Sequence, residues 1–500
     1  MSILLKLFSL RLIASILGLA YSVLQVRYFG ASRTIEIYFA AQSLVYLVTS
    51  LTQSGQLAEI FLPVYHQLNH KSKGLGFLAL NVVINRMLLY GSMLLMLMFF
   101  LAPHIISLLI PGFSASDKEF ATLIFRALIP CIYLQFVKSF FVTVLNAEKK
   151  FGRSELLGLT NGIVSIVILL VLYPYVKIWA LVISLLLGSI IEFIFYILQL
   201  YKIGFKYKFI LSHVKFNHNI FFKSMHSTLL YVGSTQIYNI VLTSSISYLP
   251  EGTFAIYKYV QNFSTKIRSL FIQPFMTLFF TEYSLFVRKS KSVVVIFYNY
   301  ISGIICMNSV IIIGSILLGE FIIYFIWGGK KFTLEDVHLA YVFLLFNALA
   351  MLLASIGGVY RKMAVTQGKA RSLYSVWVVA QLLSALFGYL IIATYKVTGL
   401  YFIVPVNSFL LGLTSYVVYK TTHNAMVYNF ITVNNIIIVC LIMLAASIKV
   451  FGFELLNADL IFDYVNDKYS MIFYFIFTII LSSYPMFIIY KVFTKQTNYV

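Results

Sequence analysis

The sequence predicts an all-α membrane protein that crosses the bilayer many times. Of its 500 residues, 61% are hydrophobic and only 11% are charged, and the mean hydropathy is +0.92. A soluble domain needs roughly 25% charged residues to cover its surface. The three cysteines all fall within apolar runs. Large soluble domains, a disulfide scaffold, a DNA-binding module and a disordered chain are therefore excluded.

Apolar runs long enough to cross a bilayer recur along the chain. A helix needs about 20 apolar residues to span the hydrocarbon. The weakest boundaries are the tight connection Tyr173–Lys177 and the segment Glu320–Trp327, which could extend the ninth helix. No clear cleavage site follows the first run, so we expect a retained helix and not a signal peptide. The fourteen predicted spans are 4–26, 35–62, 77–101, 121–146, 156–175, 177–200, 224–248, 254–281, 292–318, 337–360, 372–395, 397–419, 430–448 and 469–490.

Lys and Arg concentrate in alternate loops. One set of loops carries 20 basic and three acidic residues, whereas the opposite set carries nine of each. Cytoplasmic loops hold the excess of Lys and Arg in membrane proteins. The pattern predicts cytoplasmic termini, and it accounts for the net charge of +21 without a nucleic-acid partner. The basic loops are 63–76, 147–155, 201–223, 282–291, 361–371, 420–429 and the C-terminal tail.

Two short motifs recur at a nearly constant offset. The segment 113–117 resembles 332–336, and 150–154 resembles 368–372, at offsets of 219 and 218 residues. A unit with an even number of helices repeats in parallel, about an axis along the membrane normal. We therefore predict an N-lobe of six helices over 1–200, a cytoplasmic linker over 201–223 and a C-lobe of six helices over 224–420. Residues 421–500 would add two further helices, and the two lobes would enclose a central cavity.

The eighth predicted helix carries the most informative polar face. At 100° per residue its polar residues fall within an arc of about 160°. Three cations on one face cannot point at lipid without a large cost, so we expect a cavity wall for an anionic substrate. The alternatives are a cluster that reaches the interface from a helix end, or cations neutralised by Glu36 or Glu192. The face consists of Lys258, Gln261, Asn262, Thr265, Lys266, Arg268 and Ser269.

Other charged and polar residues at membrane depth give weaker indications. The second helix places Glu36, Ser43, Ser50 and Ser54 on one face, which could line the cavity or hold helices together. Arg86 follows Asn81 and Asn85 and could join the cavity or pair with Glu192. By contrast, Glu59, Arg126 and Glu320 are expected to reach the interface from helix ends.

Catalytic and cofactor motifs are absent from the sequence. It has no Gly-rich phosphate loop and no acidic pair of the kind that holds Mg²⁺. His66 and His70 have the spacing of a helical metal site but no third ligand nearby. We therefore expect neither an enzyme nor a cofactor.

Several short motifs of the sequence form a recognisable set. They are 26–32 (VRYFGAS), 36–41 (EIYFAA), Gly55, 61–64 (FLPV), 111–113 (PGF), 145–147 (LNA), 150–151 (KF) and 329–333 (GKKFT) with Asp336. This set resembles the lipid II flippase family (MurJ/MviN-like) of the multidrug/oligosaccharidyl-lipid/polysaccharide exporter superfamily. The resemblance implies two six-helix lobes around a V-shaped cationic cavity, with helices thirteen and fourteen forming a groove for a polyprenyl tail. It also implies an undecaprenyl-pyrophosphate-linked sugar as substrate and a bacterial plasma (inner) membrane as the location. The pyrophosphate of such a substrate fits the cationic face of the eighth helix, because Lys and Arg bind phosphate oxygens well.

This sequence keeps only part of the family's charged pattern. Arg27 and Glu36 match it. Family members typically have arginines in the first, second and eighth helices, whereas this chain has Ser15 and Tyr21, Thr49 and Ser50, and Gln261. Either Lys258, Lys266 and Arg268 substitute for them, or the substrate is a different lipid-linked glycan.

The leading prediction is a flippase that moves a lipid II-like precursor by alternating access. A flippase for a surface polysaccharide, a cation-coupled drug exporter and a membrane enzyme of glycan assembly are the alternatives. Six cations at membrane depth against four acids disfavour the drug exporter. The expected partners are a lipid-linked glycan and membrane lipids. We expect a monomer, and Na⁺ or H⁺ could be a coupling ion.

The predicted topology can be tested by thiol labelling. With both termini in the cytoplasm, an Asn498→Cys variant should be shielded from an impermeant reagent in intact cells and labelled after permeabilisation. Ready labelling in intact cells would contradict the topology.

Overall fold

The computed structural model describes residues 2–53, 61, 65, 68–70, 72–148, 151–212, 218–288, 294–421, 432–455 and 468–496. Within these ranges the chain is almost entirely helical, and the single β feature is an isolated bridge between Gly329 and Phe332. The predicted all-α fold class is confirmed. Glu59, Ser54, Gly55, His66 and Lys71 lie outside the described residues.

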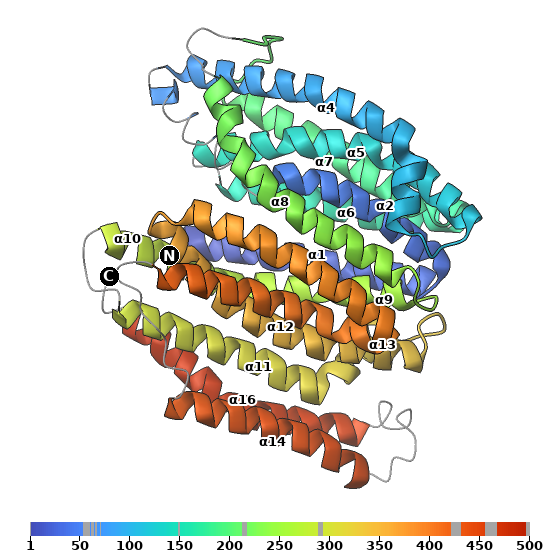
Figure 1. Ribbon diagram of the computed structural model, residues 1–500, viewed down its shortest axis with the longest axis vertical. Helices are drawn as coiled ribbons and strands as arrows, with labels where there is room; N and C mark the ends of the chain where they lie inside the picture. Colours follow the sequence, from blue (N-terminus) through green and yellow to red (C-terminus); the bar gives the residue numbers. More distant parts are fainter. Residues whose placement is uncertain are drawn as a thin grey trace. The chain divides into compact units, whose positions relative to one another are not determined.

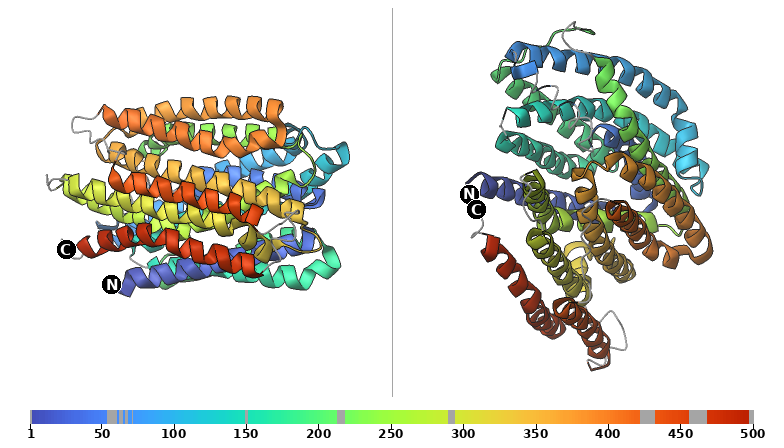
Figure 2. Two further views of the ribbon diagram at one scale, coloured as in Figure 1. Left: turned by 90° about the horizontal axis from the view of Figure 1, so that it is seen from below. Right: turned by 60° about the vertical axis from the view of Figure 1, so that its left-hand side comes forward.

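Contacts divide the chain into two compact units. The N-terminal unit comprises Met1–Gln25 and Ser32–Glu251, and the C-terminal unit comprises Val26–Ala31 and Gly252–Val500. Helices within each unit run alongside one another (Figures 1 and 2). The N-terminal unit contains most of α1 (Ser2–Phe29), then α2 (Arg33–Gln53), α4 (Lys73–Leu109), α5 (Ala115–Ala147), α6 (Phe151–Val176), α7 (Trp179–Lys202) and α8 (His218–Ile246).

The C-terminal unit contains the remaining helices and one π-helical turn. Its elements are α9 (Thr253–Ile267), η1 (Arg268–Ile272), α10 (Gln273–Arg288), α11 (Val294–Trp327), α12 (Leu334–Thr366), α13 (Ala370–Lys420), α14 (Val433–Leu455) and α16 (Lys468–Gln496).

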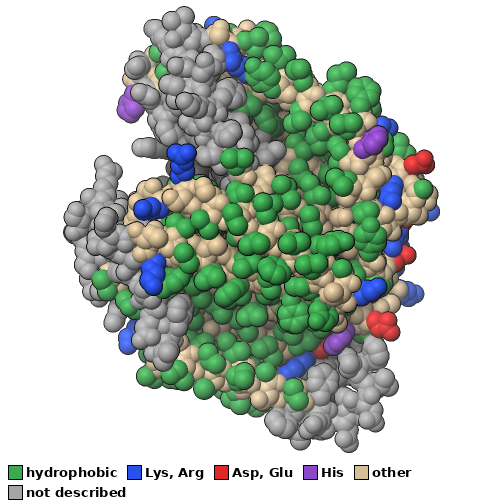
Figure 3. Space-filling view, in the orientation of Figure 1, with side chains coloured by type: hydrophobic (Ala, Val, Ile, Leu, Met, Phe, Trp, Pro, Cys, Tyr) green, Lys and Arg blue, Asp and Glu red, His purple; other side chains and the backbone are tan. Residues whose placement is uncertain are grey.

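The described helices correspond to the fourteen predicted spans. The run α9–η1–α10 forms the eighth span, and α13 contains two spans that meet at Lys396, where φ is +53°. The segment Glu320–Trp327 does extend the ninth helix, α11. Ten of the described helices are long and apolar enough to cross a membrane. Hydrophobic side chains accordingly cover much of the face shown in Figure 3.

Helix bounds repeat with the offset seen in the sequence. Both α5 and α12 have 33 residues, and their first residues, Ala115 and Leu334, are 219 positions apart. Each helix begins with the same cap: Ser114 Oγ accepts from the Asp117 amide at 3.2 Å, and Thr333 Oγ1 accepts from the Asp336 amide at 3.3 Å. Such caps satisfy amides that have no partner within the helix. The sequence motifs therefore mark equivalent helix starts.

Individual side-chain contacts repeat as well. Gln42 Nε2 donates to Tyr38 Oη at 3.0 Å in α2, and Gln261 Nε2 donates to Tyr257 Oη at 2.6 Å in α9. These pairs are related by the same 219 positions.

A rare backbone conformation recurs at the same offset. Lys177 and Lys396 are the two described non-glycine residues with positive φ, at +47° and +53°. Each follows the fifth helix of its predicted lobe. Such a conformation costs a non-glycine residue about 1–2 kcal/mol. Its recurrence together with the caps and contacts indicates a structural duplication of the six-helix unit.

The contact units and the predicted lobes have different boundaries. Helix α8, which the sequence assigns to the lobe 224–420, packs on α2 and α4 in the N-terminal unit. Conversely, the end of α1 belongs to the C-terminal unit, where Tyr28 O accepts from Lys331 Nζ at 2.7 Å. The first helix of each repeat thus ends against the other half of the sequence. The predicted lobe bounds follow the repeat and stay a prediction.

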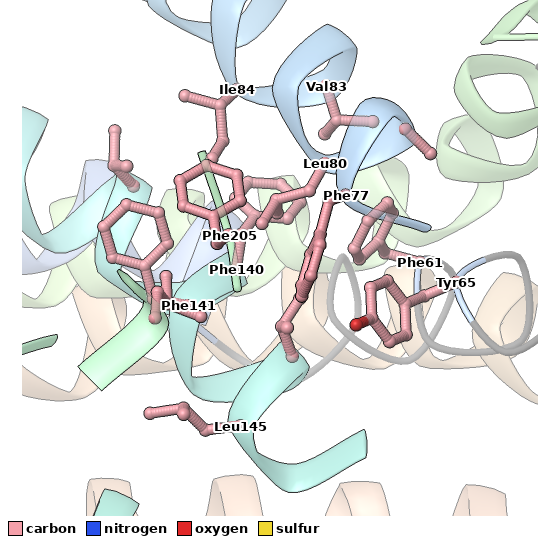
Figure 4. Packing of buried hydrophobic residues seen from close by; sticks show 14 of the residues in the cluster. Phe61, Tyr65, Phe77, Leu80, Val83, Ile84, Phe140, Phe141, Leu145 and Phe205 are labelled. Carbon is pink, nitrogen blue, oxygen red and sulfur yellow. The ribbon is translucent and has the colours of Figure 1, made fainter. Parts of the chain in front are cut away.

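A buried aromatic core holds one end of the N-terminal unit together. Figure 4 shows Phe140 and Phe141 of α5 converging with Phe77 of α4 and with Phe205, which follows α7. Phe61 meets Phe140 edge-on, with ring centroids 5.8 Å apart. Rings packed in this way gain about 0.5–1.5 kcal/mol beyond their area burial. This core fixes the ends of three helices relative to one another.

Gly30 should be hard to replace. Its φ of +61° suits glycine, and an added Cβ would lie 2.0 Å from Lys331 O. We expect Gly30→Ala to destabilise the protein by about 1–3 kcal/mol, because strain adds to the overlap. Thermal unfolding in detergent measures this. Gly158→Ala is the control, because nothing lies within 4 Å of its added Cβ; equal losses in the two variants would contradict the assignment.

Candidate functional site

The eighth span, which carries the predicted polar face, is not a uniform α-helix. It is α-helical from Thr253 to Ile267, turns π-helical over Arg268–Ile272 and resumes as α10 at Gln273. A π-helical turn is wider than an α-helical one and often marks a functional site. The uniform 100° spacing assumed for the predicted face therefore holds only as far as Ile267. Arg268 lies at the first residue of the wider turn.

Polar side chains on α9 are held mainly by their own helix. Lys258 Nζ lies 5.4 Å from the centroid of the Phe254 ring. Thr265 Oγ1 donates to Gln261 O at 2.8 Å. Asn262 and Arg268 are exposed. Within the described part of the chain, Lys258, Lys266 and Arg268 form no ion pair with a carboxylate.

The two carboxylates that could have neutralised α9 are bound elsewhere. Arg33 Nη1 contacts Glu36 Oε2 at 2.7 Å, and Glu36 is 1% exposed. The Arg33 guanidinium also stacks 4.1 Å from the Phe113 ring centroid, and its amide donates to Glu251 Oε1 at 2.7 Å. Glu36 therefore fixes the start of α2 within the N-terminal unit.

Glu192 lies in a buried polar network of the N-terminal unit. Lys138 Nζ of α5 contacts Glu192 Oε2 of α7 at 3.0 Å, and Asn161 Nδ2 of α6 donates to the same oxygen at 3.2 Å. Ser165 Oγ donates to Asn161 Oδ1 at 3.1 Å. Gly188 makes room for this network, since a Cβ there would lie 2.5 Å from Asn161 Oδ1. The network links three helices through one carboxylate.

Arg86 and its neighbours bind backbone instead of Glu192. The amides of Asn81 and Asn85 donate to Lys206 O and Lys208 O at 3.0 and 2.8 Å, and Arg86 Nε donates to Leu211 O. The alternative of an Arg86–Glu192 pair is therefore wrong. Together these side chains of α4 hold the segment that follows α7.

The serines of the second helix, α2, form hydrogen bonds with backbone carbonyls of α2 and with α8. Ser43 Oγ donates to Phe39 O at 2.7 Å. Ser50 Oγ donates to Leu47 O at 2.8 Å and accepts from Gln236 Nε2 of α8 at 2.6 Å. Polar contacts of this kind hold membrane helices together.

Glu320 does not reach the interface from a helix end, as the sequence had suggested. It is 1% exposed and contacts Lys449 Nζ of α14 at 3.2 Å and His338 Nδ1 of α12 at 3.2 Å. Lys449 Nζ also lies 5.1–5.7 Å from the ring centroids of Phe321, Tyr341 and Tyr474. Burial of a carboxylate requires such partners. The triad Glu320–His338–Lys449 thereby fastens the thirteenth span to the ninth and tenth, a contact that sequence spacing could not indicate across 129 residues.

Two further charged residues were singled out in the sequence. Arg27 is exposed near the end of α1. Arg126 is half-buried, and its Nε donates to Phe99 O at 3.1 Å.

The triad leads to a stability prediction. Lys449→Met would leave Glu320 buried without its cation, and breaking a buried pair costs about 3–5 kcal/mol. The double variant Glu320→Gln/Lys449→Met should recover most of this loss, because neither charge remains. His338→Gln should cost less, because His338 is 46% exposed at its side chain. Thermal unfolding of the parent protein and the three variants tests this. Equal stability of Lys449→Met and Glu320→Gln/Lys449→Met would contradict it.

Comparison with known proteins identifies the family. A family model described as lipid II flippase MurJ matches residues 25–464. The lipid II flippase MurJ of Thermosipho africanus is 30% identical over 180 residues, 36% of this chain and 37% of that protein. A probable lipid II flippase MurJ of Rickettsia prowazekii is 24% identical over 288 residues, 57% of this chain and 56% of that protein. The matched regions thus span about a third to a half of these relatives.

Solved structures share the fold over a larger part of the chain. An inward closed conformation of a lipid II flippase MurJ matches with a TM-score of 0.76 at 22% identity, covering 97% of this chain and 99% of that one. An inward-facing multidrug resistance MATE family transporter matches with a TM-score of 0.64 at 13% identity, covering 83% and 97%. These similarities show the fold. Because the family match extends over most of the sequence and the fold agrees with it, the chain belongs to the MurJ lipid II flippase family.

Proposed function

We propose that this protein is a flippase that moves lipid II, a polyprenyl-pyrophosphate-linked peptidoglycan precursor, across the plasma membrane of a bacterium. The observation that carries the proposal is the family match over residues 25–464. The duplicated six-helix unit supports alternating access, in which two parallel repeats move against each other around a substrate between them. The transported molecule undergoes no covalent change in such a cycle.

The cationic face of α9 is the proposed contact for the pyrophosphate. Comparison of the two repeats supports this role. At the 219-residue offset, the positions of Lys258 and Lys266 correspond to Phe39 and Leu47 of α2. Helix α2 therefore forms the same element without these charges, so the fold does not require them. Costly charges that the fold does not require are best explained by a ligand of opposite charge.

The π-helical turn adds a reason to place phosphate contacts at the end of α9. It begins at Arg268, ten residues after Lys258. Lys266 and Arg268 thereby lie where the helix widens, and an arginine binds a phosphate with two parallel hydrogen bonds. Gln261 and Asn262 supply amides on the same stretch of α9. We assign these five residues to substrate binding.

The other sequence candidates receive different roles in this proposal. Arg27 is exposed and stays a candidate for substrate contact. Glu36 binds Arg33, and Arg86 binds Leu211 O, so both act as positioning residues. We further propose a monomer with cytoplasmic termini. Na⁺ and H⁺ both stay candidates for a coupling ion.

Transport assays distinguish lipid II from a surface-polysaccharide intermediate. Purified protein in vesicles should move fluorescent lipid II faster than a pyrophosphate-linked repeat unit that lacks the peptide. Faster movement of the second substrate would instead support the surface-polysaccharide flippase, and movement of neither would contradict both.

Substitutions on α9 test the substrate contact. A hydrogen bond from a charged donor contributes about 1.5–3 kcal/mol, so Lys258→Ala and Arg268→Ala should each reduce transport about tenfold or more. Lys258→Arg should keep part of the activity, because the charge persists.

The matched control for these variants is Lys202→Ala, at an exposed lysine near the end of α7, which should leave transport nearly unchanged. Membrane insertion and yield are measured for every variant. Equal activity of Lys258→Ala, Arg268→Ala and Lys202→Ala would contradict the assignment of α9.

A further inference from the structure

A polar cavity lies between α4 and α5 in the N-terminal unit. Its volume is about 530 Å³, and it opens near the end of α4 and the start of α5. Two cations and one carboxylate line it, together with two hydroxyl groups. The lining residues are Pro103, Ser107, Ala115, Lys118, Glu119, Thr122, Leu123 and Arg126. None of them belongs to the α9 site or to the buried networks described above.

An apolar groove lies along the same two helices, which run side by side in Figure 1. Its volume is about 750 Å³, and α4, α5 and Ile190 of α7 form its walls. Phe99, Phe100 and Met96 line it on the α4 side. Arg126 of the cavity contacts Phe99 of the groove, and its guanidinium lies 4.9 Å from the centroid of the Phe99 ring.

The geometry at this junction follows from a proline. Pro103 has no amide hydrogen, so the carbonyl of Phe99, four residues earlier, loses its usual helical partner. Arg126 Nε donates to this carbonyl at 3.1 Å. Among the described residues no carboxylate pairs with Arg126, so its two terminal amino groups keep donors for a ligand. Lys118 Nζ donates to Pro111 O at 2.8 Å and keeps two further hydrogens.

The depth of the cavity matches that of a lipid headgroup. Helix α5 has 33 residues and is therefore about 50 Å long, which exceeds a hydrocarbon core of about 30 Å by about 10 Å at each end. Arg126, eleven residues after Ala115, would then have its Cα about 6 Å inside the hydrocarbon. Helical side chains point toward the N-terminus, so its guanidinium extends toward the headgroups, where Lys118 already lies.

We infer that this cavity and groove form a binding site for a membrane glycerophospholipid with an ethanolamine headgroup. The phosphate binds between Arg126 and Lys118, and one acyl chain occupies the groove beside Phe99. The exposed carboxylate of Glu119 receives the primary ammonium group. A headgroup with one phosphate and one ammonium complements two cations and one acid, whereas a phosphatidylglycerol headgroup would leave Glu119 without a partner.

The test measures lipid retention and is independent of transport. The protein is purified from membranes containing phosphatidylethanolamine and phosphatidylglycerol, and bound lipid is identified by native mass spectrometry. We expect phosphatidylethanolamine to be retained preferentially. Arg126→Gln should lower its retention about tenfold or more, because a charged donor to the phosphate is lost. Arg153→Gln, at an exposed arginine in the first turn of α6, is the matched control and should retain the lipid.

Arg126→Gln also removes the hydrogen bond to Phe99 O, which could disturb α4. The substitution is therefore repeated in a protein in which this carbonyl has another donor. Pro103→Ala restores an amide for that carbonyl, and this variant alone should keep the lipid. The double variant Pro103→Ala/Arg126→Gln should fold and still lose it. Glu119→Gln should retain lipid but no longer prefer phosphatidylethanolamine to phosphatidylglycerol.

Three outcomes would overturn the inference. The first is that the double variant retains as much lipid as the parent protein. The second is that the parent protein retains both phospholipids equally. The third is that Arg153→Gln lowers lipid retention as strongly as Arg126→Gln does.

Discussion

The absence of water from the bilayer core constrains the rest of this structure. A polar group in hydrocarbon must find its partner within the protein, which restricts each span to a helix and makes an unpaired charge costly. The structure meets this constraint by pairing. Glu192 binds Lys138 and Asn161, and Glu320 binds Lys449 and His338. The carbonyl that Pro103 leaves unpaired accepts from Arg126. Among the described residues, Lys258 and Lys266 of α9 and Arg268 of η1 form no ion pair with a carboxylate, so these three charges are informative.

Duplication provides an internal comparison between structure and function. The caps at Ser114 and Thr333 and the left-handed lysines 177 and 396 recur because both halves form the same helices. The cations of α9 do not recur in α2. Features that repeat thus belong to the fold, and features present in one copy point to what that copy has acquired. The buried triad at Glu320 falls in the second group, because it binds α14, which follows the repeat.

Several interactions were unpredictable because they depend on partners far away in the sequence. Glu320 looked like an end-of-helix residue because its sequence neighbours offer no cation, and Lys449 lies 129 residues later. Arg86 was a possible partner of Glu192, whereas its guanidinium donates to a carbonyl of the segment after α7. The π-helical turn at Arg268 also has no signature in residue spacing, because it depends on how the helix packs.

The sequence by itself determined the fold class, the fourteen spans, the duplication and the family. Each of these depends on local hydrophobicity, on loop charge or on short motifs, which the chain expresses without tertiary context. The sequence left open the tight connection at Lys177 and the extension of the ninth helix to Trp327, and the structure shows both. Only the tertiary structure decided which charges are paired, which helices α8 and the end of α1 join, and where a cavity and a groove form along α4 and α5. These are matters of distance between remote segments, and hydrophobic periodicity does not encode them.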